Sequence, residues 1–268
     1  MSIERTMRLW AWRVGRKLYC WARGDSQNDP LRNGEYWLID KVVAAVDEPG
    51  TMLDIGANKG EWSARVLGAA NAGGKQVRLF AFEPCSATRG MLQERLGTAN
   101  GVTICSTALS SNEGEADFFS NGAGSGTNSL SAASGSSSER VRLTTLDKFV
   151  DENHIDHLRM VKIDTEGFDF NVLLGAATTL SRGGVDVVQF EYNWRWLMNK
   201  ASLMDVFDFI KDKPYRLGKL AGEAIVYFDQ WHFELDRYFE NNYVLIRRGS
   251  VYERLGQVVH FDASNVGV

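Results

Sequence analysis

The sequence predicts an α/β fold of the Rossmann-like type, in which helices cover both faces of a mostly parallel, seven-stranded sheet. Short apolar runs alternate with helical patterns over residues 49–249, as they do in folds built on parallel strands. The first of these runs passes directly into a glycine-containing turn, and four of the runs end in an acidic residue. The carboxyl ends of parallel strands share one edge of the sheet, and ligands bind at that edge in such folds.

The expected elements follow one another closely along the chain. Runs typical of strands occupy residues 51–56, 77–83, 102–106, 159–163, 185–190, 215–220 and 243–247. Residues 115–120 alternate as a short additional strand, and residues 224–228 are expected to pair with the sixth strand as a hairpin. Helical patterns occupy residues 35–46, 60–70, 86–97, 146–153, 168–181 and 202–211.

Two segments outside these elements have unusual compositions. Residues 120–138 are almost wholly Gly, Ser, Ala and Asn, so they cannot contribute to a hydrophobic core. They are either a passive surface loop or an active-site lid that orders on ligand binding. Residues 250–268 are expected to be a loosely attached tail. The predicted organisation is a helical extension over residues 1–48, an α/β domain over 49–249 and a tail over 250–268.

Residues 1–24 combine apolar, aromatic and basic side chains. Apolar residues from Ile3 to Leu18 recur at intervals of three or four and are interspersed with arginines, which indicates an amphipathic helix. We expect its apolar stripe to pack on the α/β domain, as N-terminal extensions of such folds commonly do. The alternative is peripheral contact with an anionic membrane, since a basic, aromatic-rich helix can lie on such a surface.

The overall composition excludes several classes of protein. The chain has 30 Lys and Arg against 34 Asp and Glu, a net charge of −4, which argues against a nucleic-acid partner. Cys20, Cys85 and Cys105 are far apart and form no zinc-site spacing, so no metal site is predicted. No apolar run is long enough to span a membrane, and basic residues interrupt any signal-peptide core. We therefore expect a cytoplasmic protein, with membrane contact limited to residues 1–24; the sequence does not predict its oligomeric state.

The turn after the first strand indicates an adenosine-containing cofactor. Residues 53–60 (LDIGANKG) join a buried strand to a helix, and Glu83 ends the next strand, where nucleotide-binding folds hold a ribose diol. Asn58 takes the place of the glycine that admits a pyrophosphate in dinucleotide sites, and the Lys-Ser or Lys-Thr pair of a P-loop is missing. The pattern favours S-adenosylmethionine, which carries adenosine without phosphate.

Four segments resemble the FkbM family of S-adenosylmethionine-dependent methyltransferases. They are residues 53–60 (LDIGANKG), 82–84 (FEP), 143–147 (LTTLD) and 161–167 (VKIDTEG), and 172–176 (VLLGA) completes the last. The resemblance spans about residues 50–195 and implies a methyltransferase sheet whose last strand is antiparallel. It also implies O-methylation of hydroxyls, often on sugars, glycans or polyketides. Two departures, at Thr165 and at residues 168–169, concern the contact with the acceptor.

The candidate site residues lie at the carboxyl edge of the predicted sheet. Asp164 and Glu166 are the candidates for the base that accepts the hydroxyl proton, although they could instead bind acceptor hydroxyls or cap a turn. An acidic and aromatic segment after the fifth strand suits a sugar ring, and its substrate-binding candidates are Glu191, Tyr192, Asn193 and Trp194. The cofactor-binding candidates are Asp54, Gly56, Ala57, Asn58, Gly60, Glu83, Pro84, Ala108, Leu109 and Asp164.

The sequence therefore predicts an S-adenosylmethionine-dependent O-methyltransferase that acts on a hydroxyl of a sugar, glycan or related small metabolite. One alternative is an oxidoreductase with a nucleotide cofactor on the same fold. Another is a non-catalytic, membrane-associated binding module. Converging carboxylates could also hold a divalent cation, although no residue pattern requires one.

Overall fold

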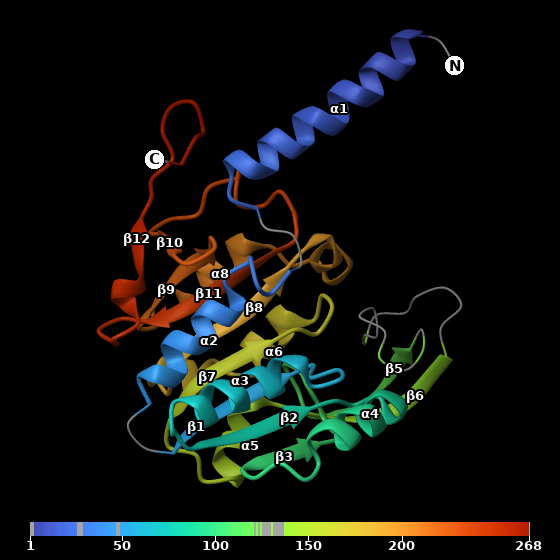
Figure 1. Cartoon of the computed structure of the whole chain (residues 1–268), viewed down its shortest axis with the longest axis vertical. Coiled ribbons are helices and arrows are strands. Elements are labelled where there is room, and N and C mark those ends of the chain that lie inside the picture. Colours follow the sequence, from blue (N-terminus) through green and yellow to red (C-terminus); the bar gives the residue numbers. More distant parts are fainter. Residues whose placement is uncertain are drawn as a thin grey trace.

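The centre of the protein is a twisted sheet of nine strands with helices on both faces (Figure 1). The computed structural model describes residues 3–25, 29–46, 49–120, 122, 124, 130 and 137–267. The sheet order is β12-β10-β9-β11-β8-β7-β1-β2-β3. These strands are β1 (Gly50–Ile55), β2 (Val77–Phe82), β3 (Val102–Cys105), β7 (Leu158–Ile163), β8 (Val185–Tyr192), β9 (Tyr215–Leu220), β10 (Ile225–Phe228), β11 (Asn241–Arg247) and β12 (Gly256–Val258).

The seven expected strands form a continuous part of this sheet. β3, β2, β1, β7 and β8 are parallel, whereas β11 is antiparallel to both of its neighbours, β8 and β9. The antiparallel strand expected from the family resemblance is thus confirmed. β10 pairs with β9 as the expected hairpin partner, and β12 is an addition at the edge.

Helices cover the two faces because successive residues of a buried strand point to opposite sides of the sheet. Met52 of β1 packs in a cluster with the helices before and after that strand, and Leu53 packs in the cluster on the opposite face. The first face carries α2 (Glu35–Ala44) and α3 (Glu61–Ala72), and α4 (Ser86–Leu96) packs beside them. The second face carries α5 (Leu146–Glu152), α6 (Asp169–Leu174), α7 (Ala177–Ser181) and α8 (Leu203–Ile210).

The helix expected over residues 168–181 is divided into α6 and α7. Gly175 follows α6, and a Cβ at this position would lie 2.1 Å from the backbone oxygen of Ser110. The chain approaches the segment after β4 (Ala108–Leu109) too closely for a side chain. Close backbone packing therefore interrupts a pattern that looks continuous in the sequence.

A separate three-stranded sheet stands beside the edge where the parallel strands end. It has the order β4-β6-β5, with β5 (Gly114–Ser120) and β6 (Ser137–Thr144) in an antiparallel hairpin. β5 corresponds to the expected short strand, whereas β6 was missed because its first residues are polar. Most of the candidate lid over residues 120–138 lies outside the described residues.

The prediction of a loosely attached C-terminal tail is wrong for the first half of residues 250–268. Tyr252 is buried in the same cluster as α2, and its backbone oxygen accepts a hydrogen bond from the hydroxyl of Tyr227 at 3.3 Å. A short helix, η2 (Glu253–Leu255), then leads into β12. The side chains of α2 likewise belong to the core of the α/β domain. The domain limits drawn from the sequence stay a prediction.

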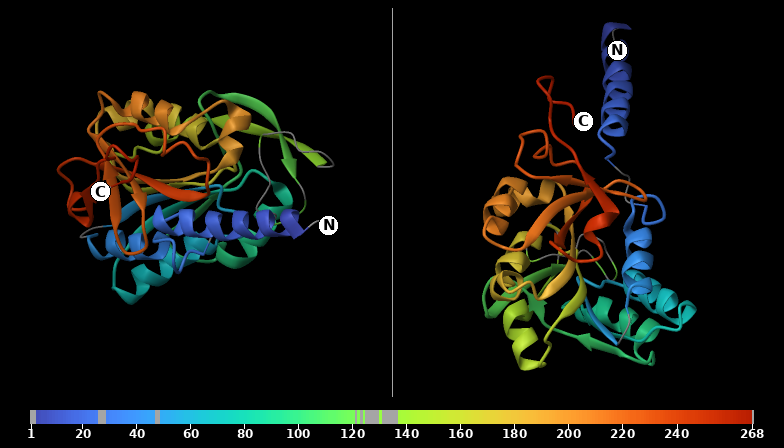
Figure 2. Two further views of the ribbon diagram at one scale, coloured as in Figure 1. Left: turned by 90° about the horizontal axis from the view of Figure 1, so that it is seen from above. Right: turned by 90° about the vertical axis from the view of Figure 1, so that its left-hand side faces the viewer.

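The N-terminal helix α1 (Ile3–Ala22) does not pack on the domain in the expected way. None of its residues is buried, and it projects away from the body of the molecule (Figures 1 and 2). Near its carboxyl-terminal end, Tyr19 donates a hydrogen bond to Glu234 of the domain. Among the described residues, no helix is both long and apolar enough to cross a membrane.

Candidate active site

The turn from β1 to α3 forms the floor of the site. Gly56 has φ of +83°, and a Cβ there would lie 1.9 Å from the backbone oxygen of Asp164. Only glycine fits at this crossing of two chain segments. The backbone N–H groups of Gly56 and Ala57 donate to the oxygen of Phe82 at 3.1 and 2.9 Å. The turn is therefore held against β2 and β7, and its outer surface faces the edge of the sheet.

Two of the expected cofactor residues lie behind this floor. Asp54 is fully buried and accepts a hydrogen bond from the hydroxyl of Ser63 at 2.6 Å, which ties β1 to α3. Gly60 has φ of +78° and packs against Leu92 of α4. Neither residue lines the cavity. Both shape the turn, and their direct contact with a cofactor stays a prediction.

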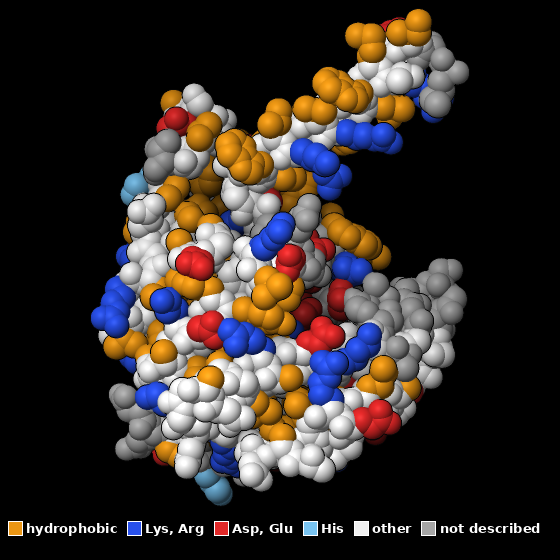
Figure 3. Space-filling view, in the orientation of Figure 1, with side chains coloured by type: hydrophobic (Ala, Val, Ile, Leu, Met, Phe, Trp, Pro, Cys, Tyr) orange, Lys and Arg blue, Asp and Glu red, His pale blue; other side chains and the backbone are white. Residues whose placement is uncertain are grey.

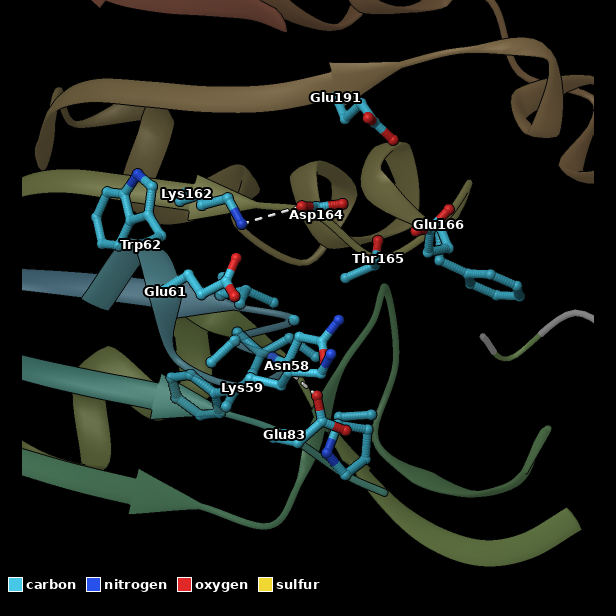
Figure 4. Close-up of a pocket in the computed structure, with 18 of the residues that line it drawn as sticks. Asn58, Lys59, Glu61, Trp62, Glu83, Lys162, Asp164, Thr165, Glu166 and Glu191 are labelled. Atoms are coloured by element: carbon cyan, nitrogen blue, oxygen red, sulfur yellow. Dashed lines mark hydrogen bonds and ion pairs between the residues drawn. The ribbon is translucent and has the colours of Figure 1, made fainter. Parts of the chain in front are cut away.

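A cavity of about 360 Å³ opens at the carboxyl ends of β2, β1, β7 and β8 (Figure 4). These four strands are adjacent, and three inter-strand steps of about 4.8 Å place the ends of β2 and β8 about 14 Å apart. The site residues predicted from the sequence that line the cavity are Gly56, Ala57, Asn58, Glu83, Pro84, Ala108, Leu109, Asp164, Glu166 and Glu191.

Glu83 braces the turn from which the cofactor site is built. Its two carboxylate oxygens accept hydrogen bonds from the N–H groups of Asn58 at 3.0 Å and Cys85 at 2.9 Å. Burial raises the pKa of Glu83 to about 7, although both N–H groups and the nearby Arg89 oppose the rise. Each carboxylate oxygen can accept a second hydrogen bond, so Glu83 can hold the turn and still bind a ligand hydroxyl.

Lys162 of β7 lines the cavity, and it was not identified as a site residue from the sequence. Its Nζ lies 3.0 Å from Oδ2 of Asp164 and 3.8 Å from Oδ1 of Asp54. Burial alone would lower the pKa of Lys162, but Asp164, Asp54 and Glu35 raise it above its ordinary value. The three acids therefore stabilise the charged form of the lysine. The sequence carried a signal for it: in a strand, residues i and i+2 share a face, so Lys162 had to lie beside Asp164.

α2 and α3 add further side chains that the sequence did not single out. Glu35 accepts a hydrogen bond from Nε2 of Gln189 at 2.6 Å, and burial raises the pKa of Glu35. Trp62 is 3% exposed, and its indole N–H has no hydrogen-bond partner among the described residues. Trp62, Glu61 and Lys162 lie on the same side of the cavity in Figure 4. This side therefore offers both a cation and a buried donor.

The turn after β7 presents Glu166 to the opposite side of the cavity. Asp169 accepts hydrogen bonds from the N–H groups of Thr165 at 3.4 Å and Gly167 at 3.1 Å, which fixes the turn. Glu166 has a left-handed φ of 55°, and Oε2 lies 2.9 Å from the guanidinium of Arg195. Burial and the nearby Asp164 raise the pKa of Glu166 to about 7, against the opposing effect of Arg195.

Glu191 is the last residue but one of β8 and faces the same region as Asp164 and Glu166 (Figure 4). Burial raises its pKa well above the ordinary value, and Asp164 and Glu166 add to the rise. The amide of Asn193 donates to Oε2 of Glu191 at 2.7 Å. Asn193 is almost fully buried and also accepts the N–H of Arg195. It therefore positions Glu191 and does not itself line the cavity, contrary to expectation.

Tyr192 and Trp194 are also placed differently from the expectation. Tyr192 is fully buried, packs against Trp196, and donates its hydroxyl to Asp236 at 2.6 Å. It is a core residue because the side chain after Glu191 must point to the opposite face of β8. Trp194 is 56% exposed and stacks with Arg195, outside the cavity lining. Of the four expected substrate-binding residues, Glu191 alone lines the cavity.

The cavity is strongly acidic. Six of its lining residues are acids and two are lysines, namely Glu35, Glu61, Glu83, Asp164, Glu166, Glu191, Lys59 and Lys162. Like charges this close favour a bound cation or protonation of some of the acids. Within the described part of the chain, no group of three or more His, Cys, Asp or Glu side chains is arranged to hold a metal ion.

Comparisons with solved structures find methyltransferases at low similarity. An S-adenosylmethionine-dependent methyltransferase from Agrobacterium tumefaciens is 11% identical, with a TM-score of 0.44 over 81% of this chain and 61% of that chain. The N-methyltransferase NodS from Bradyrhizobium japonicum is 9% identical, with a TM-score of 0.42 over 82% of this chain and 97% of that chain.

Comparisons of sequence are more informative. The hexuronic acid methyltransferase AglP from Haloferax volcanii is 27% identical over 158 residues, which are 58% of this chain. The alignment spans 62% of the length of that relative. The methyltransferase FkbM domain matches residues 54–217, more than half of the chain and all four strand ends that form the cavity. The chain therefore belongs to the FkbM family of methyltransferases.

Proposed function

We propose that this enzyme transfers the methyl group of S-adenosylmethionine to a hydroxyl of a neutral sugar, glycan or related polyhydroxy metabolite. The observation that carries the proposal is the convergence of Asp164, Glu166 and Glu191 at the β7 and β8 end of the cavity. Glu83 lies at the other end, beside the turn after β1. One cavity can therefore hold an adenosine at one end and an acceptor at the other.

The residues present fit the cofactor. Glu83 would accept the ribose hydroxyls, and Ala108 and Leu109 are small or apolar neighbours for the adenine. The indole N–H of Trp62, which has no hydrogen-bond partner among the residues that the structure describes, and the cation of Lys162 would bind the methionine carboxylate. The acidic lining is complementary to a positively charged sulfur and an ammonium group. When bound, S-adenosylmethionine supplies a methyl group on a cationic sulfur.

Glu166 is the favoured base for the acceptor hydroxyl. A carboxylate whose pKa lies near 7 can accept a proton at neutral pH and later return it to solvent. Arg195 and the Asp169-braced turn hold Glu166 in place. Asp164 is bound to Lys162 at 3.0 Å, so it is the weaker candidate for proton transfer and the better one for positioning. Positioning of the hydroxyl supplies most of the acceleration in a direct displacement.

The acceptor end disfavours a negatively charged acceptor. Glu191 already has a raised pKa because it is buried and because Asp164 and Glu166 are close. A uronate carboxylate placed there would meet the same repulsion. The acceptor of AglP, by its name, carries such a group, so we infer a difference in acceptor between the two enzymes. Hydroxyl groups, in contrast, can donate hydrogen bonds to all three acids.

A panel of neutral hexosides and the matching uronates tests this proposal. Release of S-adenosylhomocysteine would be measured for each acceptor, and the methylated product treated with mild alkali. We expect turnover on neutral acceptors and an alkali-stable methyl ether. Turnover confined to uronates, or an alkali-labile methyl ester, would overturn the proposal.

A further inference from the structure

We propose that α1 binds the surface of anionic membranes, with its axis in the plane of the membrane and its apolar stripe in the interface. The stripe is formed by Ile3, Met7, Trp10, Val14, Leu18 and Trp21. These residues recur at intervals of three or four and therefore share one face of the helix. Trp10, Trp21 and Ile3 are 68, 79 and 82% exposed. An apolar face this exposed marks an interaction surface.

The charge of α1 is complementary to anionic lipid. Its only acid is Glu4, which pairs with Arg8 at 2.8 Å, and it carries Arg5, Arg8, Arg13, Arg16 and Lys17. The whole chain, by contrast, has a net charge of −4. A basic helix with tryptophans on its apolar face lies in the headgroup region of a membrane. There the apolar side chains contact the acyl chains and the basic side chains contact the anionic headgroups. Twenty residues give such a helix a length of about 30 Å.

The attachment of α1 to the domain leaves this stripe facing outward. Arg23, just after the helix, donates to Glu234 at 3.0 Å, and Arg16 lies over the ring of Phe239 at 5.3 Å. Tyr19 packs edge-on against the same ring. In Figure 3, most hydrophobic side chains of α1 lie along its outer edge, and basic side chains lie toward the body of the molecule. The domain therefore holds one end of α1 and does not cover its apolar stripe.

A second copy of this chain is a poorer occupant of the stripe. Two α1 helices packed face to face would bring their basic residues together, and repulsion between these like charges opposes such a pair. The single Glu4 of each helix could not balance these charges. An anionic lipid surface meets both requirements, because it takes up the apolar face and attracts the flanking arginines and lysine.

Sedimentation with lipid vesicles tests the proposal on the full chain. Vesicles of phosphatidylcholine mixed with phosphatidylglycerol should bind the protein at low salt and release it at high salt, whereas pure phosphatidylcholine should bind weakly. Trp10→Ser with Trp21→Ser should weaken binding by about tenfold or more. Arg13→Gln with Lys17→Gln should do the same on anionic vesicles. The melting temperature should not change, because no residue of α1 is buried.

Trp12→Ser is the matched control. Trp12 is 70% exposed, almost the same as Trp10, but a step of two residues turns about 200° around the helix and places Trp12 on the other side. This variant should retain most of the binding. Equal binding to neutral and anionic vesicles would overturn the proposal. So would a loss of binding in Trp12→Ser as large as that in Trp10→Ser with Trp21→Ser. So would a dimer in sedimentation velocity that the Trp10 and Trp21 substitutions dissociate, without vesicle binding by the parent.

Discussion

The Nζ of Lys162 lies 3.0 Å from Oδ2 of Asp164, in the middle of the acidic edge where the cavity opens. The same ammonium is 3.8 Å from Oδ1 of Asp54, behind the cavity floor. Lys162 therefore connects the structural acid of the β1 turn with an acid of the site. The positive charge of Lys162 reduces the repulsion between the carboxylates that share this edge.

Removal of this charge should destabilise the protein. Lys162→Met leaves Asp54 buried without a cation, and we expect the free energy of unfolding to fall by about 3 kcal/mol. Adding Asp54→Asn to Lys162→Met should recover part of the loss, since the uncompensated charge is then absent. Denaturant unfolding of both variants measures this. A Lys162→Met protein as stable as the parent would show that Lys162 does not balance these acids.

Glu166 should control the pH dependence of turnover. Because its pKa is raised to about 7, the carboxyl is neutral below that pH and cannot accept a proton. The kcat of the parent should therefore rise with pH through about 7 and then level off. Glu166→Gln should lower kcat by about 100-fold or more and remove this rise, with cofactor affinity little changed.

Glu61→Gln is the control for this measurement. Glu61 lines the opposite side of the cavity, so its amide variant should keep the rise through neutral pH. If Glu166→Gln retains both kcat and the pH profile, Glu166 is not the base, and Asp164 or positioning alone must account for turnover.

Glu83 should be required for cofactor affinity. Both of its carboxylate oxygens accept hydrogen bonds from backbone N–H groups. Glu83→Gln would replace one oxygen by an amide N–H₂, which would face one of these N–H groups and could not accept its hydrogen bond. We expect S-adenosylmethionine binding to weaken by about 2 kcal/mol or more, measured by calorimetric titration. The melting temperature of the free protein, measured alongside, separates loosening of the turn from loss of the ribose contact. An unchanged dissociation constant would remove Glu83 from the cofactor site.

Asp186 should stabilise the far end of the sheet. It lies 3.0 Å from Arg159, 2.7 Å from Arg247 and 3.1 Å from His157. Burial alone would raise its pKa, but hydrogen bonds from these three residues lower it to about 2. A lowered pKa means that the ionised form is stabilised by folding, so this contribution is present above about pH 4 and is lost as the pH falls toward 2.

Asp186→Asn tests that interaction. The variant should lower the free energy of unfolding at neutral pH by about 2 kcal/mol or more. Its free energy of unfolding should also fall less steeply than that of the parent as the pH is lowered from about 4 toward 2. Asp40→Asn, which breaks a half-exposed pair with Arg65, should have a much smaller effect because solvent screens that pair. Equal losses in the two variants would contradict the assignment of Asp186.

The motifs predicted the floor of the site well because they report backbone requirements. The segment 53–60 needs a turn that only glycine allows at Gly56, and Glu83 directly follows the adjacent strand β2. Alternation of strands and helices likewise predicted correctly that the sheet is mostly parallel. These features are local, or follow from the general topology of α/β sheets.

Residues whose placement depends on long-range packing were not predicted. Tyr192 and Asn193 follow Glu191 directly, but the two faces of β8 separate Tyr192 from the cavity. β12 is too short and polar to be recognised without its partner β10. The amphipathic pattern of residues 3–22 indicated a helix, yet periodicity cannot tell whether the apolar face packs on the same chain.

A crystal structure with S-adenosylhomocysteine tests the central claim most directly. The account predicts that the ribose hydroxyls contact Glu83, that the adenine lies beside Ala108 and Leu109, and that the sulfur faces the space between Asp164, Glu166 and Glu191. A ribose bound away from Glu83, or a homocysteine portion that fills the space between those three acids and leaves no room for an acceptor, would contradict it.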